Sequence, residues 1–410
     1  MGKEDYDVIV VGGGLSGSSA AMFCKKQGLK VLMLEKSKFP RDKTCGDAES
    51  GKTVGILREL GMDKEIEKLQ HAKIHAVLLS SPNGSKARIL FPKGEKANRQ
   101  YGYVSKRILF DNLVFQKAKK MADKTIENFT VTDLIQENDY VVGVKGAGKD
   151  GKEQEFRAKI VVGADGATSI VAQKLGIANK DPDHYILAVR AYYKNVTEAK
   201  DAIELHFLDS FMPGYFWIFP VGDNEVNVGA GMVLKDMKKK KVNLREGMFK
   251  VIKEEKILIE RFKNAKLVEG SVKGWQLPVG STHQKNHGNG FLLVGDAGSL
   301  IDPFTGEGMG NGMTSGKYAA LTAAKAIKKG DFSESFLSMY DIQLWADIGG
   351  ELKTSTMMQR IGRFKFLLNW LIGKAERSEQ AREMITSTLT NEEAKNVYLT
   401  PWFYIKLLFS

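Results

Sequence analysis

The chain has 410 residues, of which 43% are hydrophobic and 27% are charged, and its formal net charge is +12. This composition is ordinary for a globular protein of two or three structural units, and it excludes a disordered or collagen-like chain. The two cysteines, Cys24 and Cys45, are too few for a disulfide framework or a multi-cysteine metal site, so we predict no metal. The positive charge favours anionic partners.

The N-terminal segment predicts a β-α-β unit, because apolar runs at residues 6–11 and 30–34 flank a stretch with helical spacing at 16–28. No signal-peptide pattern precedes the first run. Near the C-terminus the apolar stretch 366–373 is far shorter than the roughly 20 residues that a membrane-spanning helix needs. We therefore expect a cytoplasmic protein that does not span a membrane.

A glycine-rich turn lies between the first strand and the helix, where Gly12, Gly14 and Gly17 form a G-x-G-x-x-G pattern. Glu35 ends the next strand about 20 residues later. The glycines allow close backbone approach, the helix N-terminus attracts a pyrophosphate, and the acid accepts from a ribose hydroxyl. The pattern predicts a dinucleotide site; the alternative is a purely structural glycine turn.

The middle of the chain predicts a second sheet. Two apolar runs within residues 74–91 flank the turn sequence S-P-N-G, which indicates a hairpin. Four further strand-like runs cover residues 185–193, 202–207, 215–220 and 225–231. A buried strand at 291–294 and a helix from about 308 to 327 follow, and the chain after 335 is mostly helical.

We therefore predict a mixed α/β protein, in which a Rossmann-type domain is interrupted by an antiparallel-sheet substrate domain and followed by a helical region. The first domain is discontinuous, and its three segments are residues 1–70, 96–183 and 276–335. The substrate domain takes residues 71–95 and 184–275, and the C-terminal helical region takes 336–410.

NAD and FAD share the glycine fingerprint, so further segments must distinguish them. Residues 158–169 (A-K-I-V-V-G-A-D-G-A-T-S) and 291–297 (F-L-L-V-G-D-A) resemble flavoproteins similar to p-hydroxybenzoate hydroxylase. That resemblance implies FAD, with the element containing Asp165 near the nucleotide and Asp296 at the ribityl chain. A carboxylate at the end of a buried strand suits ribityl hydroxyls, although either acid alone is compatible with an ordinary turn.

The same resemblance implies further FAD contacts. Gly308 and Met309 follow D-P-F-T-G-E at the start of the long helix, where backbone N–H groups could approach a reduced flavin. Arg107, in V-S-K-R-I-L-F-D-N-L, matches an arginine beside the cofactor, although a solvated helix charge is the alternative. Val131 matches an apolar position near adenine, and the backbone of Ser16 would lie at the pyrophosphate turn.

Two segments indicate which flavoprotein this is. Residues 43–52 (K-T-C-G-D-A-E-S-G-K) and 213–220 (P-G-Y-F-W-I-F-P) resemble the geranylgeranyl reductase family, including archaeal digeranylgeranylglycerophospholipid reductases. The resemblance spans residues 5 to about 330. It implies a loop at the flavin and an aromatic wall at a prenyl pocket. The residues concerned are Cys45, Gly46 and Asp47 in the loop, and Tyr215, Trp217 and Phe219 in the wall.

The implied activity is FAD-dependent saturation of C=C bonds in prenyl lipids, such as digeranylgeranylglycerophospholipid or geranylgeranyl diphosphate. An isolated alkene is a poor hydride acceptor, so we expect hydride transfer with protonation at the other carbon. Trp217, Tyr215 and Phe219 would form an apolar wall whose π faces shelter the developing positive charge. Cys45 would position the flavin or the alkene, and Tyr215 or a water would supply the proton; the alternative for Cys45 is core packing.

Other assignments and partners follow from the same residues. An FAD-dependent monooxygenase is the main alternative, and a lipid carrier without turnover is a third class. A halogenase is disfavoured, because the loop at residues 43–52 lacks a lysine in a K-x-G-E-S context. The sequence has no second G-x-G-x-x-G, so we expect electrons to come from NAD(P)H at a transient site or from a partner protein such as ferredoxin. The basic cluster Lys238–Lys241 would bind such an acidic partner; the alternative is that this cluster is a solvated loop. Residues 362–374 suggest either an interfacial helix on anionic lipid or a buried helix. We expect no nucleic-acid partner.

Overall fold

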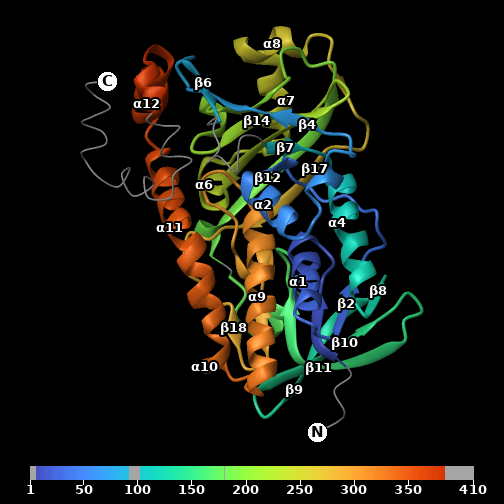
Figure 1. The fold of residues 1–410 in the computed structure, drawn as a ribbon. Coiled ribbons are helices and arrows are strands. Elements are labelled where there is room, and N and C mark those ends of the chain that lie inside the picture. The colour runs from blue at the N-terminus through green and yellow to red at the C-terminus, as the bar shows by residue number, and fades with distance from the viewer. Residues whose placement is uncertain (1–5, 92–101, 180, 384–410) are drawn as a thin grey trace.

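The computed structural model describes residues 6–91, 102–179 and 181–383, which form two large sheets, one small sheet and a set of covering helices (Figure 1). The first sheet lies in the lower half of Figure 1 and has the order β18-β19-β11-β1-β2-β8, with β9 and β10 attached through β11. Its strands are β1 (Tyr6–Val11), β2 (Val31–Glu35), β8 (Lys124–Glu127), β9 (Thr130–Glu137), β10 (Tyr140–Ala147), β11 (Glu153–Gly163), β18 (His287–Gly288) and β19 (Phe291–Leu293).

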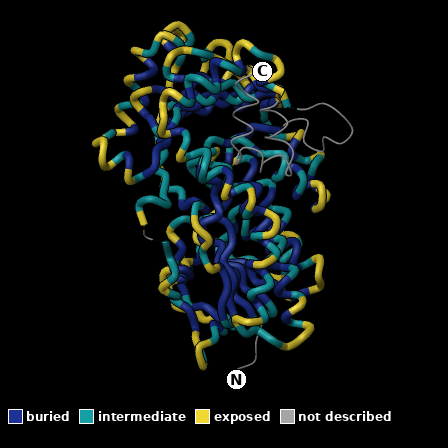
Figure 2. Tube along the Cα trace, turned by 90° about the vertical axis from the view of Figure 1, so that its left-hand side faces the viewer, coloured by how far each residue is buried: buried dark blue, intermediate teal, exposed yellow. Residues whose placement is uncertain are grey.

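Alternating side chains explain how β1 is buried on both faces. Val8 and Val10 pack on one face against helices, while Ile9 and Val11 pack on the other against the β9–β10 ribbon. The helices on the first face include α1 (Leu15–Lys26), α4 (Arg107–Met121) and α9 (Met309–Lys329). Figure 2 shows the result as a bundle of buried strands enclosed by more exposed segments. The predicted β-α-β unit is confirmed, with β1, β2 and β11 parallel.

The second sheet lies in the upper half of Figure 1 and has the order β16-β12-β15-β14-β13-β5-β6, with β17 paired to β12. The strands are β5 (Ala76–Ser80), β6 (Lys86–Leu90), β12 (Tyr185–Lys194), β13 (Ala202–His206), β14 (Tyr215–Gly222), β15 (Glu225–Val233), β16 (Lys266–Leu267) and β17 (Lys273–Pro278). The hairpin and the four later strands are confirmed. The prediction that this sheet is antiparallel is wrong at one pairing, because the hairpin joins the other strands through a parallel pairing of β5 with β13.

The two faces of this sheet have different neighbours. On β14, Phe216 and Ile218 pack outward with residues of α7 (Leu244–Glu254) and α8 (Lys256–Phe262). Because side chains alternate along a strand, Tyr215, Trp217 and Phe219 share the opposite, inward face. The inward face therefore carries the aromatic residues that the sequence singled out.

The division into domains remains a proposal, which strand membership supports in outline. Strands β5 and β6 belong to the second sheet although they precede its other members by a long stretch of chain, and β18 and β19 return to the first. The proposed limit at residue 276 falls inside β17, so the second sheet extends to Pro278. A small sheet of β3 (Ala48–Glu49), β7 (Gly102–Val104) and β4 (Ala72–Ile74) lies at the junction.

Helices complete the described structure. The junction helices are α2 (Gly51–Glu59) and α3 (Asp63–Ile66), and the shorter ones are α5 (Ile170–Lys174) and α6 (Leu234–Lys240). The C-terminal helices are α10 (Glu334–Leu337), α11 (Met339–Ile361) and α12 (Lys365–Arg377), and α12 packs beside β6. The tail after 383, including the aromatic residues 401–404, lies outside the described residues. Within the described part of the chain, no helix combines the length and the hydropathy needed to cross a bilayer.

Candidate active site

A cavity of about 1920 Å³, here called the central cavity, connects the two sheets. Its lining begins at the glycine turn after β1, passes the loop around Cys45, and continues along β14 to α12. Ordinary ligand pockets measure about 300–1,000 Å³, so this cavity has room for more than one ligand.

The glycine turn fits a dinucleotide. Gly12 has a φ of +105°, and a Cβ at this position would overlap the carbonyl oxygen of Ala164. A Cβ on Gly17 would overlap the carbonyl oxygen of Gly12, so α1 can pack on the turn only with glycine there. Gly12, Gly14 and Ser16 line the central cavity, whereas Gly17 lies behind it and holds the helix in place.

The residues expected around the adenosine moiety lie beside this turn. Glu35 is 5% exposed, and its two carboxylate oxygens accept from the backbone N–H groups of Gly13 (2.7 Å) and Ser37 (2.8 Å). Each oxygen keeps a lone pair that could accept from a ribose hydroxyl. Val131 lies on β9, and the pairing of β9 with β10 places it at the same end of the cavity.

Arg41 is a cationic residue at the turn that the sequence analysis missed. Its guanidinium would lie 3.4 Å from a Cβ on Gly14, stacks 4.7 Å from the ring centre of Phe39, and donates to Asp111 at 2.7 Å. Arginine matches the bidentate geometry of phosphate oxygens, so Arg41 is suited to a pyrophosphate. No spacing rule connects it to the glycine motif, which is why the motif did not reveal it.

The two strand-end carboxylates differ in their surroundings. Asp296 lies in the short helical turn after β19, lines the central cavity, and accepts from the Lys43 ammonium at 2.7 Å. Lys43 is a second cation that the sequence analysis did not single out. Asp165 accepts from Ser169 and from the backbone N–H of Ile170, so it caps α5. Asp165 also lines the central cavity, and its Cα lies 3.1 Å from the position of a Cβ on Gly12, so the segment that contains it lies beside the glycine turn.

The far end of the cofactor cradle is the first turn of α9. Gly308 caps this helix and Met309 begins it, and both line the central cavity. Glu307 accepts from the backbone N–H of Gly310 at 2.6 Å. The positive end of the helix dipole at this point favours negative charge on a bound group.

Arg107 is buried, so the alternative of a solvated helix charge is wrong. It begins α4, is 3% exposed, and its side chain donates to Asp111 at 2.5 and 2.9 Å, while its backbone N–H donates to the Asp47 carboxylate at 3.4 Å. Burial alone would raise the pKa of the Asp111 carboxyl, but the guanidinium groups of Arg107 and Arg41 hold that pKa below its usual value. Arg107 thereby connects the flavin-side loop to α4.

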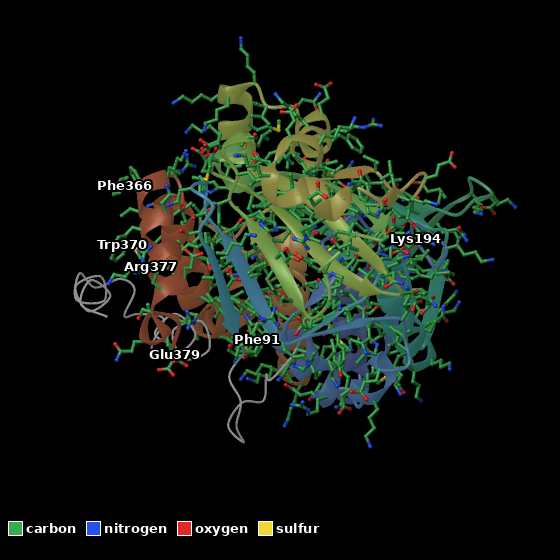
Figure 3. All side chains as sticks on the ribbon, turned by 90° about the horizontal axis from the view of Figure 1, so that it is seen from above. Phe91, Lys194, Phe366, Trp370, Arg377 and Glu379 are labelled. Carbon is green, nitrogen blue, oxygen red and sulfur yellow. The ribbon has the colours of Figure 1, made fainter. Side chains whose placement is uncertain are left out.

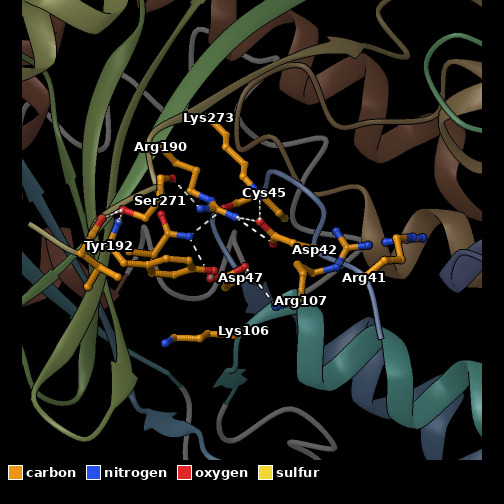
Figure 4. Close-up of polar contacts among 12 residues, drawn as sticks. Arg41, Asp42, Cys45, Asp47, Lys106, Arg107, Arg190, Tyr192, Ser271 and Lys273 are labelled. Carbon is orange, nitrogen blue, oxygen red and sulfur yellow. Dashed lines mark hydrogen bonds and ion pairs between the residues drawn. The ribbon is translucent and has the colours of Figure 1, made fainter. Parts of the chain in front are cut away.

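The loop containing Cys45, Gly46 and Asp47 is fixed by the second sheet (Figure 4). Asp47 adopts a left-handed conformation with a φ of 70°, and its buried carboxylate accepts from the Tyr192 hydroxyl at 2.6 Å. Burial raises the pKa of this carboxyl to about 6. A Cβ on Gly46 would lie 2.9 Å from the Phe219 ring, so the loop rests directly on the aromatic strand.

Arg190 holds the beginning of the same loop. This residue of β12 is 1% exposed and donates to both carboxylate oxygens of Asp42, at 2.8 and 2.6 Å. Lys273 reaches the same carboxylate at 2.7 Å. Neither contact was expected, because each joins segments more than a hundred residues apart in the sequence.

The predicted aromatic wall is present on β14. The ring centre of Trp217 lies 6.2 Å from that of Tyr215 and 6.2 Å from that of Phe219, and all three residues line the central cavity. The Tyr215 hydroxyl donates to the carbonyl oxygen of Thr305 at 2.7 Å, and burial raises its pKa. As a proton source, Tyr215 would therefore have to give up this hydrogen bond.

Beyond Tyr215 the central cavity continues as an apolar channel between the β5–β6 hairpin and α12. The lining of this channel includes Leu79, Ile89, Leu367, Leu368, Leu371 and Ile372. From its sequence, α12 was expected to be either an interfacial or a buried helix. Its inward face in fact belongs to the candidate site.

Comparison with known proteins agrees with this geometry. Residues 5–343 match the family model described as FAD binding domain. The chain is 34% identical to digeranylgeranylglycerophospholipid reductase 2 of Methanococcoides burtonii, over 87% of this chain and 84% of that protein. A geranylgeranyl bacteriochlorophyll reductase-like protein of Thermoplasma acidophilum superposes with a TM-score of 0.83 and 25% identity, covering 97% and 98% of the two chains.

A flavin-dependent brominase also superposes, with a TM-score of 0.76 and 22% identity over 96% of this chain and 97% of that one. At this identity the likeness concerns the fold alone. The same architecture thus serves different reactions, so the residues at the site must decide among them.

Proposed function

Because the chain belongs to the FAD-binding domain family, within the group that includes digeranylgeranylglycerophospholipid reductases, we propose that it saturates the C=C bonds of geranylgeranyl chains. The protein is a flavoprotein oxidoreductase with FAD as its cofactor. One observation carries the proposal: the central cavity joins the dinucleotide cradle to an aromatic and aliphatic channel.

The cradle fits FAD along its whole length. Glu35 and Val131 suit the adenosine, the Gly12 turn and Arg41 suit the pyrophosphate, and Asp296 suits the ribityl hydroxyls. The flavin end would lie between the Cys45 loop with Arg107 and the start of α9 with Gly308 and Met309. Bound and reduced, FAD supplies the hydride.

The chain's own residues provide the rest of the chemistry. Trp217 and Phe219 exclude water from the reacting carbons and offer π faces to positive charge that develops during protonation. The Cys45 loop sets the distance between this wall and the cofactor. Tyr215 stands at the entrance to the apolar channel, where its hydroxyl or a bound water would deliver the proton.

The substrate we propose is an anionic prenyl lipid, such as digeranylgeranylglycerophospholipid or geranylgeranyl diphosphate. The channel lining is aliphatic and aromatic, which suits a branched hydrocarbon chain. The net charge of +12 favours a phosphate-bearing head group.

The electron donor we propose is NAD(P)H or a ferredoxin-like protein. Lys238–Lys240 form the last turn of α6 rather than a loop, and Lys240 donates to the Met212 carbonyl oxygen.

An anaerobic titration tests the reductase proposal. We expect the protein to carry oxidised flavin, to bleach on chemical reduction, and to regain its visible absorbance when a geranylgeranyl lipid is added without oxygen. The fully saturated phytanyl lipid is the control and should leave the bleached spectrum unchanged. Recovery of absorbance only after oxygen is admitted would contradict the proposal and favour a monooxygenase.

We further propose that α12 contacts an anionic membrane surface from which the lipid enters. Phe364 and Phe366 are 54% and 67% exposed, and Figure 3 shows Phe366 on the outer edge of the molecule. The opposite face of the helix lines the channel. Arg363 and Lys365 form ion pairs with Asp236 and Asp209, at 2.7 and 2.6 Å, so the contact that we propose rests on the exposed aromatic side chains.

The double substitution Phe364→Ser with Phe366→Ser should weaken binding to vesicles containing anionic phospholipid at least about tenfold, since burying an aromatic side chain contributes about 1.5–3 kcal/mol. Vesicle co-sedimentation measures this. The matched control is Ile342→Ser, because Ile342 is 68% exposed on α11 and does not line the channel. Equal binding by both variants would contradict the membrane proposal and leave the reductase proposal untouched.

A further inference from the structure

Asn227 connects the flavin-side loop to the aromatic wall. It is the third residue of β15 and has no exposed surface. Its side-chain nitrogen donates to the Cys45 carbonyl oxygen at 2.6 Å and to the Asp47 carboxylate at 2.9 Å, while its side-chain oxygen accepts from the Trp217 indole N–H at 2.9 Å. A buried amide is costly unless hydrogen-bonded, so these three partners constrain one another.

The register of the sheet places Asn227 between two residues of the site. It pairs with Tyr192 on β12 and with Phe219 on β14, and facing residues of neighbouring strands project to the same side of a sheet. Tyr192 also donates to Asp47, so two adjacent side chains of the second sheet hold the same carboxylate. The loop is thereby fixed to the row of side chains that carries the aromatic wall.

The strand itself does not require an amide at this position. Every residue of β15 is buried, and its neighbours Val226 and Val228 pack into the outer core. The backbone pairing of β15 with β12 and β14 is independent of side-chain identity. What depends on the Asn227 side chain is the alignment of the loop with Trp217.

We propose that Asn227 is a positioning residue that sets the separation between the Cys45 loop and the Trp217 ring, and so places the substrate alkene against the cofactor. This inference rests on the proposed reductase function. A displacement of about 1 Å between reacting groups can cost about 100-fold in rate. Asn227 acts through other residues and does not itself contact the reacting carbons.

The test is single-turnover reduction of a geranylgeranyl lipid by the FAD-loaded protein without oxygen. We expect Asn227→Ala to keep its FAD and to lower the rate of lipid-driven flavin reoxidation about 10- to 100-fold, with less than a threefold change in half-saturating lipid concentration. Ser80→Ala is the matched control, because it removes a buried hydrogen bond to His206 on the same sheet without touching the loop.

Asn227→Asp gives a readout that a purely structural role would not produce. The new carboxylate could still accept from Trp217, but above about pH 6 it would face the ionised Asp47. Two adjacent carboxylates share a proton as the pH falls, and the protonated one can donate again. The other titratable or charged groups around this position include Cys45, Glu49, Lys106, Arg107, Arg190 and Tyr192.

We therefore expect the rate of Asn227→Asp to recover towards that of the unaltered protein as the pH is lowered from 8 to 5, while Asn227→Ala shows no recovery. Asn227→Ala turning over as fast as Ser80→Ala, or no pH-dependent recovery of Asn227→Asp, would overturn the inference. Failure of the unaltered protein to reduce the lipid would instead refute the proposed function, so the two failures are distinguishable.

Discussion

Gly12→Ala is expected to purify without FAD and without reductase activity. The φ of +105° is unfavourable for any residue with a Cβ, and that Cβ would overlap the carbonyl oxygen of Ala164. The turn between β1 and α1 would therefore have to move away from β11, which removes the close backbone approach that a pyrophosphate requires. The ratio of flavin absorbance to protein absorbance measures the loss.

The control for backbone strain is Gly28→Ala. Gly28 also has a positive φ, +79°, but no other atom of the described residues lies within 4 Å of the position of its Cβ. We expect this variant to lose about 1 kcal/mol of stability and to retain its FAD. Wild-type flavin content in Gly12→Ala would mean that the turn does not hold the cofactor.

Trp217→Ala is expected to keep its FAD but to lower kcat/KM for the lipid about 100-fold. Trp217 is 7% exposed and fills the wall between Tyr215 and Phe219, so its removal admits water and withdraws a π face from the reacting carbons. Loss of about 2–3 kcal/mol of transition-state stabilisation corresponds to this change. Trp217→Phe keeps a ring but loses the hydrogen bond to Asn227, so we expect a smaller loss, about tenfold.

Steady-state kinetics with the lipid measure kcat/KM for these variants, and Trp345→Ala is the control. Trp345 lies on α11 outside the central cavity, so this variant removes an indole without touching the wall. If Trp345→Ala lost as much activity as Trp217→Ala, the effect would reflect general destabilisation rather than the wall.

Local spacing made the cofactor cradle predictable. Gly12, Gly14 and Glu35 belong to one β-α-β unit, and their positions follow from the geometry of a strand, a turn and a helix. The aromatic wall was predictable for the same reason, since period-two alternation along one strand places Tyr215, Trp217 and Phe219 on one face.

The contacts that hold these parts together were not predictable. Asn227 binds the carbonyl oxygen of Cys45 from 182 residues away, and no periodicity or motif relates the two. The inward face of α12 joined the site only because this helix packs beside β6. Asp165 combines both interpretations, because it lines the central cavity and also accepts from backbone N–H groups of α5.

The mass of the lipid after anaerobic turnover tests the central claim most directly. Our account predicts a gain of about two mass units for each double bond that reacts, from one hydride and one proton, with the flavin returned to its oxidised form. An unchanged lipid mass under these conditions would contradict the account. So would a gain of about sixteen mass units that occurs only once oxygen is admitted, because one inserted oxygen atom marks a monooxygenase.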